Sequence, residues 1–198
     1  MEDKANTRSR RALVLIDFQN DFIQPTGRMP VAQTQVASVL SAARQAITLA
    51  RATGDLVVAI GNEFRHSDYL MNLLRRSASM AGSPGAQWVR DLPLDGIPYF
   101  PKWASSAFVN SDFDRWLHAE NVHTLRLAGL QAKACVTATA KDAMKRGYSV
   151  EVLDDAIACV SDRSRARALA RLERRGVRRV KGAMGLAALH RLFWYEWR

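Results

Sequence analysis

The chain has 198 residues, of which 48% are hydrophobic, and carries a formal net charge of +10. This length favours one well-filled domain over two domains of ordinary size. No apolar run reaches the roughly 20 residues that a membrane-spanning helix needs, and the start of the chain lacks the apolar centre of a signal peptide. We therefore expect a cytoplasmic protein without a membrane partner, with a flexible segment over residues 1–10 and a single domain over residues 11–198.

Much of the positive charge gathers late in the chain, in Arg163, Arg165, Arg167, Arg171, Arg174, Arg175, Arg178, Arg179 and Lys181. Such a segment attracts polyanions in a salt-dependent way, which leaves a basic polyanion-binding scaffold as one alternative function. Aromatic residues do not interleave with these arginines, and zinc-finger and RRM spacings are absent. We interpret the segment as a solvated helix face and do not expect nucleic-acid binding.

The first predicted strand is the unbroken apolar run of residues 12–16, which is typical of a central parallel strand covered on both faces. Asp17 follows it directly. Its carboxylate is expected at the edge where open α/β sheets bind ligands, although an Asx turn that ends the strand is an alternative. A Pro/Gly loop and a long helix over residues 31–53 come next, and Gly54 ends that helix.

A second apolar strand is predicted over residues 56–60, and polar residues follow it. Asn62, Glu63 and His66 are capable of binding a metal, but a single histidine without a partner at ligand spacing does not predict a metal site. A short helix over residues 68–76 and a loop of small residues over 77–85, a candidate lid, complete this region.

The third predicted strand covers residues 97–100. Pro98 lies near its start and Pro101 follows its end, which favours the edge of the sheet. Lys102 follows it, either as a surface charge or as a cation at the ligand-binding edge. A helix that Asn110 or Ser111 caps and a strand over residues 122–127 come next.

Residues 125–155 are predicted to form one continuous unit of a strand, a turn, a helix and a second strand, with Cys135 in the turn. A thiol at the first residues of a helix meets unpaired backbone N–H groups and the positive end of the helix dipole, and both favour the thiolate. The alternative is that Cys135 is a small buried hydrophobe. Cys135 and Cys159 fit no disulfide framework or metal cluster.

The last elements are an arginine-rich helix that Ser161 or Asp162 caps, a strand over residues 177–180, and a helix over residues 182–197 with an aromatic end. Strands and helices alternate throughout, which predicts an α/β fold of three layers: a doubly wound, Rossmann-like arrangement of a mostly parallel sheet of five or six strands. Asp17, Lys102 and Cys135 then each follow a strand at one edge, the kind of constellation that activates a nucleophile.

The chain resembles the isochorismatase-like cysteine hydrolases in three separate blocks. These are LVLIDFQNDF around Asp17, PKWASSAF around Lys102, and GLQAKACVTATAKDAMKRGYSVEVLDDA around Cys135. The resemblance covers roughly residues 11–180 and implies an isochorismatase-like fold with Asp17, Lys102 and Cys135 as catalytic triad. It also implies a cis peptide bond between Leu130 and Gln131, which costs about 3–4 kcal/mol, and an oxyanion hole made by the N–H groups of Gln131 and Cys135.

The resemblance further implies a pocket wall at Phe22, and Trp103 is a second candidate for substrate binding. Nicotinamidases of the family carry an Asp-x-His metal site after the second strand, whereas this chain has Asn62 to Phe64 there. We therefore expect no metal and no cofactor, and a metal-independent cysteine hydrolase that cleaves a small amide or carbamoyl C–N bond through a thioester. An isochorismatase-type vinyl-ether hydrolase is the alternative. The resemblance also implies a homodimer or homotetramer.

Overall fold

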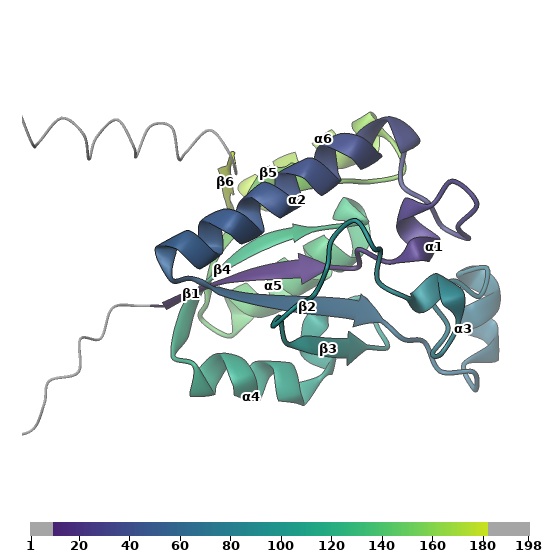
Figure 1. Ribbon diagram of the computed structural model, residues 1–198, viewed down its shortest axis with the longest axis horizontal. Helices are drawn as coiled ribbons and strands as arrows, with labels where there is room; N and C mark the ends of the chain where they lie inside the picture. The colour runs from purple at the N-terminus through teal and green to yellow at the C-terminus, as the bar shows by residue number, and fades with distance from the viewer. Residues whose placement is uncertain (1–9, 182–198) are drawn as a thin grey trace, which may run out of the picture.

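The computed structural model describes residues 10–181 as a twisted sheet between two layers of helices (Figure 1). The sheet has six strands in the order β3-β2-β1-β4-β5-β6, and each neighbouring pair is parallel. The strands are β1 (Arg10–Ile16), β2 (Leu56–Asn62), β3 (Tyr99–Lys102), β4 (Val122–Gly129), β5 (Ser149–Ile157) and β6 (Arg178–Val180). The predicted doubly wound fold is confirmed, and the strand order reverses at the boundary between β1 and β4.

The helices are α1 (Asn20–Ile23), α2 (Gln33–Thr53), α3 (Tyr69–Leu74), α4 (Ser111–Ala119), α5 (Thr137–Lys145) and α6 (Asp162–Glu173). Two short 3₁₀ turns, η1 (Pro84–Ala86) and η2 (Ala107–Val109), and one π turn, η3 (Ala132–Val136), join them. Among the described residues, no helix is long and apolar enough to cross a bilayer.

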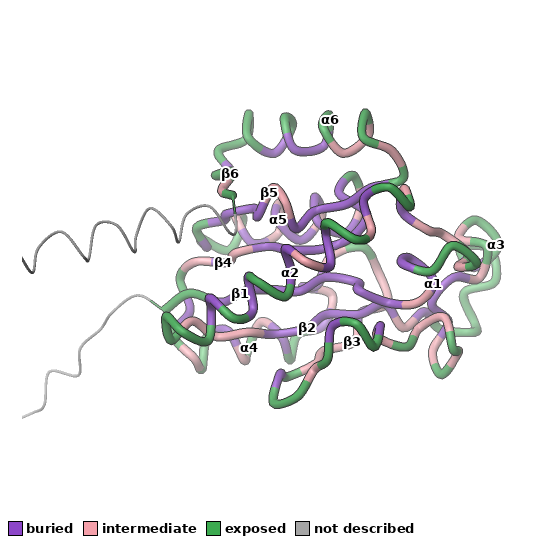
Figure 2. The backbone as a smooth tube through the Cα atoms, turned by 45° about the horizontal axis from the view of Figure 1, so that its top comes forward, coloured by how far each residue is buried: buried purple, intermediate pink, exposed green. Residues whose placement is uncertain are grey.

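The apolar core lies on both faces of the sheet. Buried residues of α2 pack on one face with Leu13 and Leu15 of β1, and buried residues of α4, α5 and α6 pack on the other face with Val14 and Ile16. Alternate residues of one strand therefore serve opposite core layers, which explains why β1 reads as an unbroken apolar run. Figure 2 shows the buried strands in the middle and the exposed outer faces of α2 and α6.

The register of the strands brings their carboxyl ends together at one edge. Ile16 pairs with Ile60 of β2 and with Gly129 of β4, and Asn62 pairs with Lys102 of β3. Gly129 is required by close packing, because a Cβ atom there would lie 2.6 Å from the carbonyl oxygen of Ile16. The chain segments that follow β1 and β4 therefore start side by side at this edge.

Several predicted boundaries are wrong by a few residues. Arg10 belongs to β1 and pairs with Val122, so the prediction of a flexible segment is wrong for this residue, and residues 1–9 lie outside the described residues. The third strand begins at Tyr99, after Pro98, because its pairing with β2 begins at Ala59. The expected helix over residues 182–197 lies outside the described residues.

Candidate active site

Asp17 and Lys102 form a buried ion pair at the carboxyl edge of the sheet. The Nζ atom of Lys102 lies 3.1 Å from Oδ2 of Asp17, and both side chains are 0% exposed. Lys102 is the last residue of β3, and Asp17 follows the last residue of β1. The backbone of Asp17 has a φ of 62°, and its N–H donates to the carbonyl oxygen of Ile60 over 2.8 Å. A left-handed conformation in a residue other than glycine is a strained arrangement that is common at functional sites.

The side chain of Asn62 connects this ion pair to Cys135. Its Oδ1 atom accepts a hydrogen bond of 2.6 Å from Nζ of Lys102, and its Nδ2 donates to Sγ of Cys135 over 3.9 Å. Buried Gln19 fixes the backbone of Asn62 through two bonds of 2.8 Å, accepting from its N–H and donating to its carbonyl oxygen. The amide of Asn62 is thereby held with its oxygen toward the ammonium and its nitrogen toward the sulfur.

Cys135 lies in η3, immediately before α5, and is 7% exposed. Burial, together with the negative charge of the Asp17 carboxylate, raises the pKa of the Cys135 thiol to about 12, and Lys102 and Asn62 oppose this rise. The sequence had favoured a thiolate because of the helix start. Burial and the adjacent carboxylate outweigh that effect here and favour the thiol over the thiolate.

Burial also raises the pKa of Asp17, although the positive charge of Lys102 and hydrogen bonding to Cys135 act in the opposite direction. Asp17 and Cys135 are thus two weak acids beside one ammonium in a buried site. Together, the side chains of Asp17, Lys102 and Cys135 have no net charge when Asp17 and Cys135 hold one proton between them. Moving that proton from the sulfur to the carboxylate keeps the group neutral, so it creates a thiolate without creating net charge.

The turn between β4 and Cys135 is made at Gln131, which has a φ of 58° and is 5% exposed. All peptide bonds of residues 10–181 are trans, so the cis bond expected between Leu130 and Gln131 is wrong. The left-handed conformation of Gln131 makes the turn instead. Its side-chain Nε2 donates to the carbonyl oxygen of Met29 over 3.0 Å, which ties the turn to the loop after α1. The backbone N–H of Gln131 has no hydrogen-bond partner within residues 10–181.

The two predicted substrate-binding residues occupy different environments. Phe22 of α1 is 3% exposed and packs in the core layer that α2 covers, where it contributes to the apolar interior. Trp103 follows Lys102 directly and is partly buried, with the guanidinium of Arg65 over its ring, 5.0 Å from the centroid. Of this pair, the structure places Trp103 under the guanidinium of Arg65 after β3 and Phe22 among apolar side chains.

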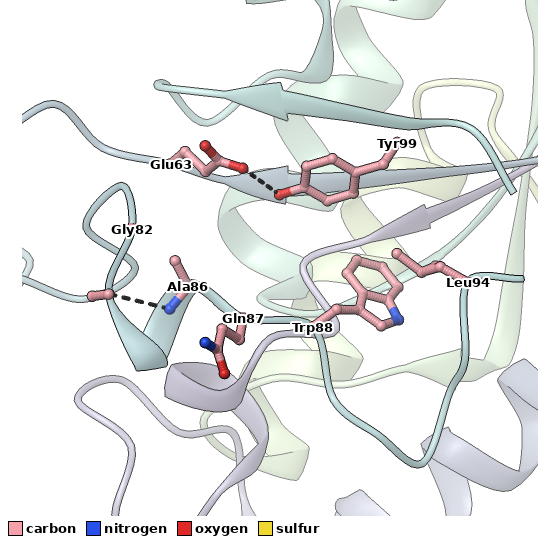
Figure 3. Close-up of a pocket in the computed structure, with 8 residues that line it drawn as sticks. Glu63, Gly82, Ala86, Gln87, Trp88, Leu94 and Tyr99 are labelled. Carbon is pink, nitrogen blue, oxygen red and sulfur yellow. Dashed lines mark hydrogen bonds between the residues drawn. The ribbon is translucent and has the colours of Figure 1, made fainter.

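A separate cavity of about 400 Å³ lies beside β2 and β3 (Figure 3). Its walls include Trp88, Leu94, Tyr99 and Glu63, and the Tyr99 hydroxyl donates to Oε1 of Glu63 over 3.0 Å. Asp17, Lys102 and Cys135 are not among the residues that line it. Because the reactive groups lie elsewhere, we do not assign this cavity to the active site.

Comparison with known proteins identifies the family of this chain. Residues 11–182 match the model of the isochorismatase domain. The chain belongs to the isochorismatase family. A ureidoacrylate amidohydrolase of Stutzerimonas stutzeri is 28% identical over 179 residues, 78% of this chain and 72% of that protein. A maleamate amidohydrolase of Pseudomonas putida is 30% identical over 159 residues, 77% of this chain and 72% of that protein.

Among solved structures, N-carbamoylsarcosine amidase from Thermoplasma acidophilum superposes with a TM-score of 0.75 at 29% identity, covering 87% of this chain and 96% of that one. This isochorismatase-family chain is a hydrolase, and the relatives named here are amidohydrolases or an amidase.

The polar side chains considered above as possible metal ligands have protein partners in this isochorismatase-family chain. Asn62 joins Lys102 to Cys135, Glu63 accepts from Tyr99, and His66 Nε2 lies 3.2 Å from the carbonyl oxygen of Ala81. Within residues 10–181, no three His, Cys, Asp or Glu side chains gather as a metal site.

Sequence reasoning missed the roles of Asn62 and Gln19 in the site. The sequence did hold a signal for Asn62: a polar amide stands at the end of an apolar strand. That position lies at the same edge of the sheet as Asp17 and Lys102. Gln19 offered no comparable signal, because its two bonds to the Asn62 backbone bridge 43 positions of the chain.

Proposed function

We propose that this chain is a metal-independent cysteine hydrolase that cleaves a small amide or carbamoyl C–N bond through a thioester on Cys135. One observation carries the proposal: an unbroken set of contacts runs from Asp17 through Lys102 and Asn62 to the sulfur of Cys135. The names of the relatives support the bond type, because ureidoacrylate, maleamate and N-carbamoylsarcosine each offer an amide or carbamoyl carbonyl.

In the proposed reaction, Asp17 takes the proton of Cys135 as the sulfur attacks the carbonyl carbon. The carbonyl π electrons move to oxygen, and the N–H groups of Gln131 and Cys135 would stabilise this oxyanion. Removing one donor of this kind typically costs about 2.7–4 kcal/mol of barrier. The oxyanion then collapses, the C–N bond breaks, and protonated Asp17 gives its proton to the departing nitrogen.

A water molecule completes the cycle. Asp17 takes a proton from it as its oxygen attacks the thioester carbonyl, and the C–S bond breaks when this second intermediate collapses. The sulfur leaves as a thiolate and regains the proton from Asp17. Lys102 takes no part in these proton transfers and keeps its contact with Asp17, where its positive charge favours the carboxylate form.

The test is ammonia release from a panel of small amides and ureido compounds that includes maleamate and ureidoacrylate. We expect Cys135→Ala to abolish the release while leaving the melting temperature within a few degrees of the wild-type value. Cys159→Ala is the matched control, because Cys159 is also a buried thiol but lies in the segment after β5. Unchanged turnover in Cys135→Ala would overturn the proposal, and pyruvate release from a vinyl ether by the alkylated enzyme would favour the alternative.

A further inference from the structure

Two arginine side chains near the carboxyl edge rest on aromatic rings. The guanidinium carbon of Arg65 lies 5.0 Å from the ring centroid of Trp103, and that of Arg75 lies 3.9 Å from the ring centroid of Phe64. A guanidinium over an aromatic face gains cation–π attraction while its N–H edge stays free to bind a planar anion.

Neither guanidinium is neutralised within residues 10–181. Arg65 and Arg75 have no side-chain hydrogen bond or ion pair there, whereas Arg165 and Arg179 both pair with Asp154. An exposed arginine that is already paired with a carboxylate binds an anionic ligand more weakly, because its charge is partly neutralised. Arg65 therefore holds a positive charge that is available for binding.

The position of Arg65 relates it to the reactive groups. It follows Asn62 by three positions, and Trp103, on which it rests, follows Lys102 directly. Asn62 and Lys102 are the terminal residues of adjacent strands and pair with each other in the sheet. Arg65 and Trp103 thus follow the strand ends that carry Asn62 and Lys102, the two residues that contact Cys135 and Asp17. Lys102 is already paired with Asp17, whereas no carboxylate of the described residues pairs with Arg65.

We propose that Arg65, held on the ring of Trp103, binds a carboxylate of the substrate, so that the substrate class is a small amide or ureido acid with a free carboxylate. This inference rests on the proposed cysteine hydrolase function and specifies its substrate. A guanidinium binds a carboxylate through two parallel N–H donors, which fixes orientation as well as charge. The carboxylate end would sit against Arg65, and the amide or carbamoyl carbon would face the sulfur of Cys135.

The experiment compares two alkylating reagents of nearly equal size at Cys135: iodoacetate, which carries a carboxylate, and neutral iodoacetamide. Their rates at Cys135 are measured by peptide mass spectrometry on the whole protein. We expect Arg65→Gln to lower the ratio of the iodoacetate rate to the iodoacetamide rate by about 10-fold, because a hydrogen bond to a charged group is lost. Trp103→Leu should lower the ratio in the same direction, because Arg65 then loses its support.

Arg174→Gln is the matched control. Arg174 is exposed at the C-terminal end of α6, and its substitution changes the net charge of the protein by the same amount as Arg65→Gln does. It should leave the rate ratio unchanged. With maleamate and its neutral diamide as substrates, Arg65→Gln should raise the KM for maleamate only, with kcat preserved.

The outcomes separate the two proposals. An equal rate ratio in wild type and Arg65→Gln, with Cys135 reactive, overturns the carboxylate assignment and leaves the hydrolase proposal standing. A Cys135 that reacts with neither reagent overturns both.

Discussion

At the scale of single residues, the site places charged groups in the buried interior. Lys102 and Asp17 are both 0% exposed, and a buried ammonium is stable only beside an anion. Cys135 competes with Asp17 for that role, since both are acids and their pKa values are raised by burial. The sulfur therefore becomes an anion only as Asp17 becomes neutral, which couples activation of the nucleophile to the base that later serves as acid.

Asp17→Asn should separate thiolate formation from catalysis. The substitution removes the negative charge that raises the pKa of Cys135 and leaves Lys102 in place, so the Cys135 pKa should fall below its wild-type value of about 12. We expect faster alkylation of Cys135 by iodoacetamide at pH 8 than in wild type, together with loss of amide hydrolysis. Slower alkylation in the variant would contradict this account of the shared proton.

At the scale of the elements, two strand ends and one π turn position the reactive groups. β1 and β4 approach closely at Gly129, and η3 then places Cys135 at the start of α5. The chain thus leaves β4 in direct contact with the end of β1. This arrangement depends on backbone proximity more than on any single polar contact.

Gly129→Ala should disturb this junction. The added methyl group would lie 2.6 Å from the backbone oxygen of Ile16, so the two strands must separate. We expect the free energy of unfolding to fall by about 1–3 kcal/mol and Cys135-dependent hydrolysis to fall with it, as measured by urea unfolding and by ammonia release. Ser149→Ala, at an exposed position of β5, is the control. A fully stable and active Gly129→Ala protein would show that the strands have room here.

Ser161→Ala tests the cap of α6, the helix that packs beside η3. The Ser161 hydroxyl oxygen accepts from the N–H of Ser164 over 3.2 Å. Losing such a cap typically costs about 1 kcal/mol. Urea unfolding should show that decrease with hydrolysis nearly unchanged, because the cap does not touch the reactive groups. Stability equal to that of wild type would mean that another group satisfies this helix start.

At the scale of the whole molecule, the positive charge is distributed in two ways. Part of the late arginine-rich segment is neutralised in place, since Arg165 and Arg179 bind Asp154, and Arg178 binds Glu151. The rest is exposed on α6 and beyond it, at Arg163, Arg167, Arg171, Arg174, Arg175 and Lys181. This matches the predicted solvated helix face. Assembly as a homodimer or homotetramer stays a prediction.

The stability of the whole molecule should also report the burial of Asp17. Because its pKa is raised above 3.8 in the folded state, that state binds the proton more tightly than the unfolded state does. The resulting stabilisation is present below about pH 4 and is lost as the pH rises through the folded-state pKa. In urea unfolding, we expect the difference in unfolding free energy between Asp17→Asn and wild type to shift in favour of the variant as the pH rises above about 4. The control is Asp91→Asn, at an exposed position, and an identical trend in both variants would contradict the prediction.

The sequence by itself determined the class of fold and the three residues Asp17, Lys102 and Cys135 as candidates. Apolar runs, helix periods and the residue after each strand are local properties, and parallel strands then require their carboxyl ends to share an edge. Only the tertiary structure decided what those residues meet: the Asn62 amide between Lys102 and the sulfur, the trans turn at Gln131, and the burial that raises the pKa of Cys135. Burial, strand register and contacts between distant segments set these features, and none of them is a property of a short stretch of chain.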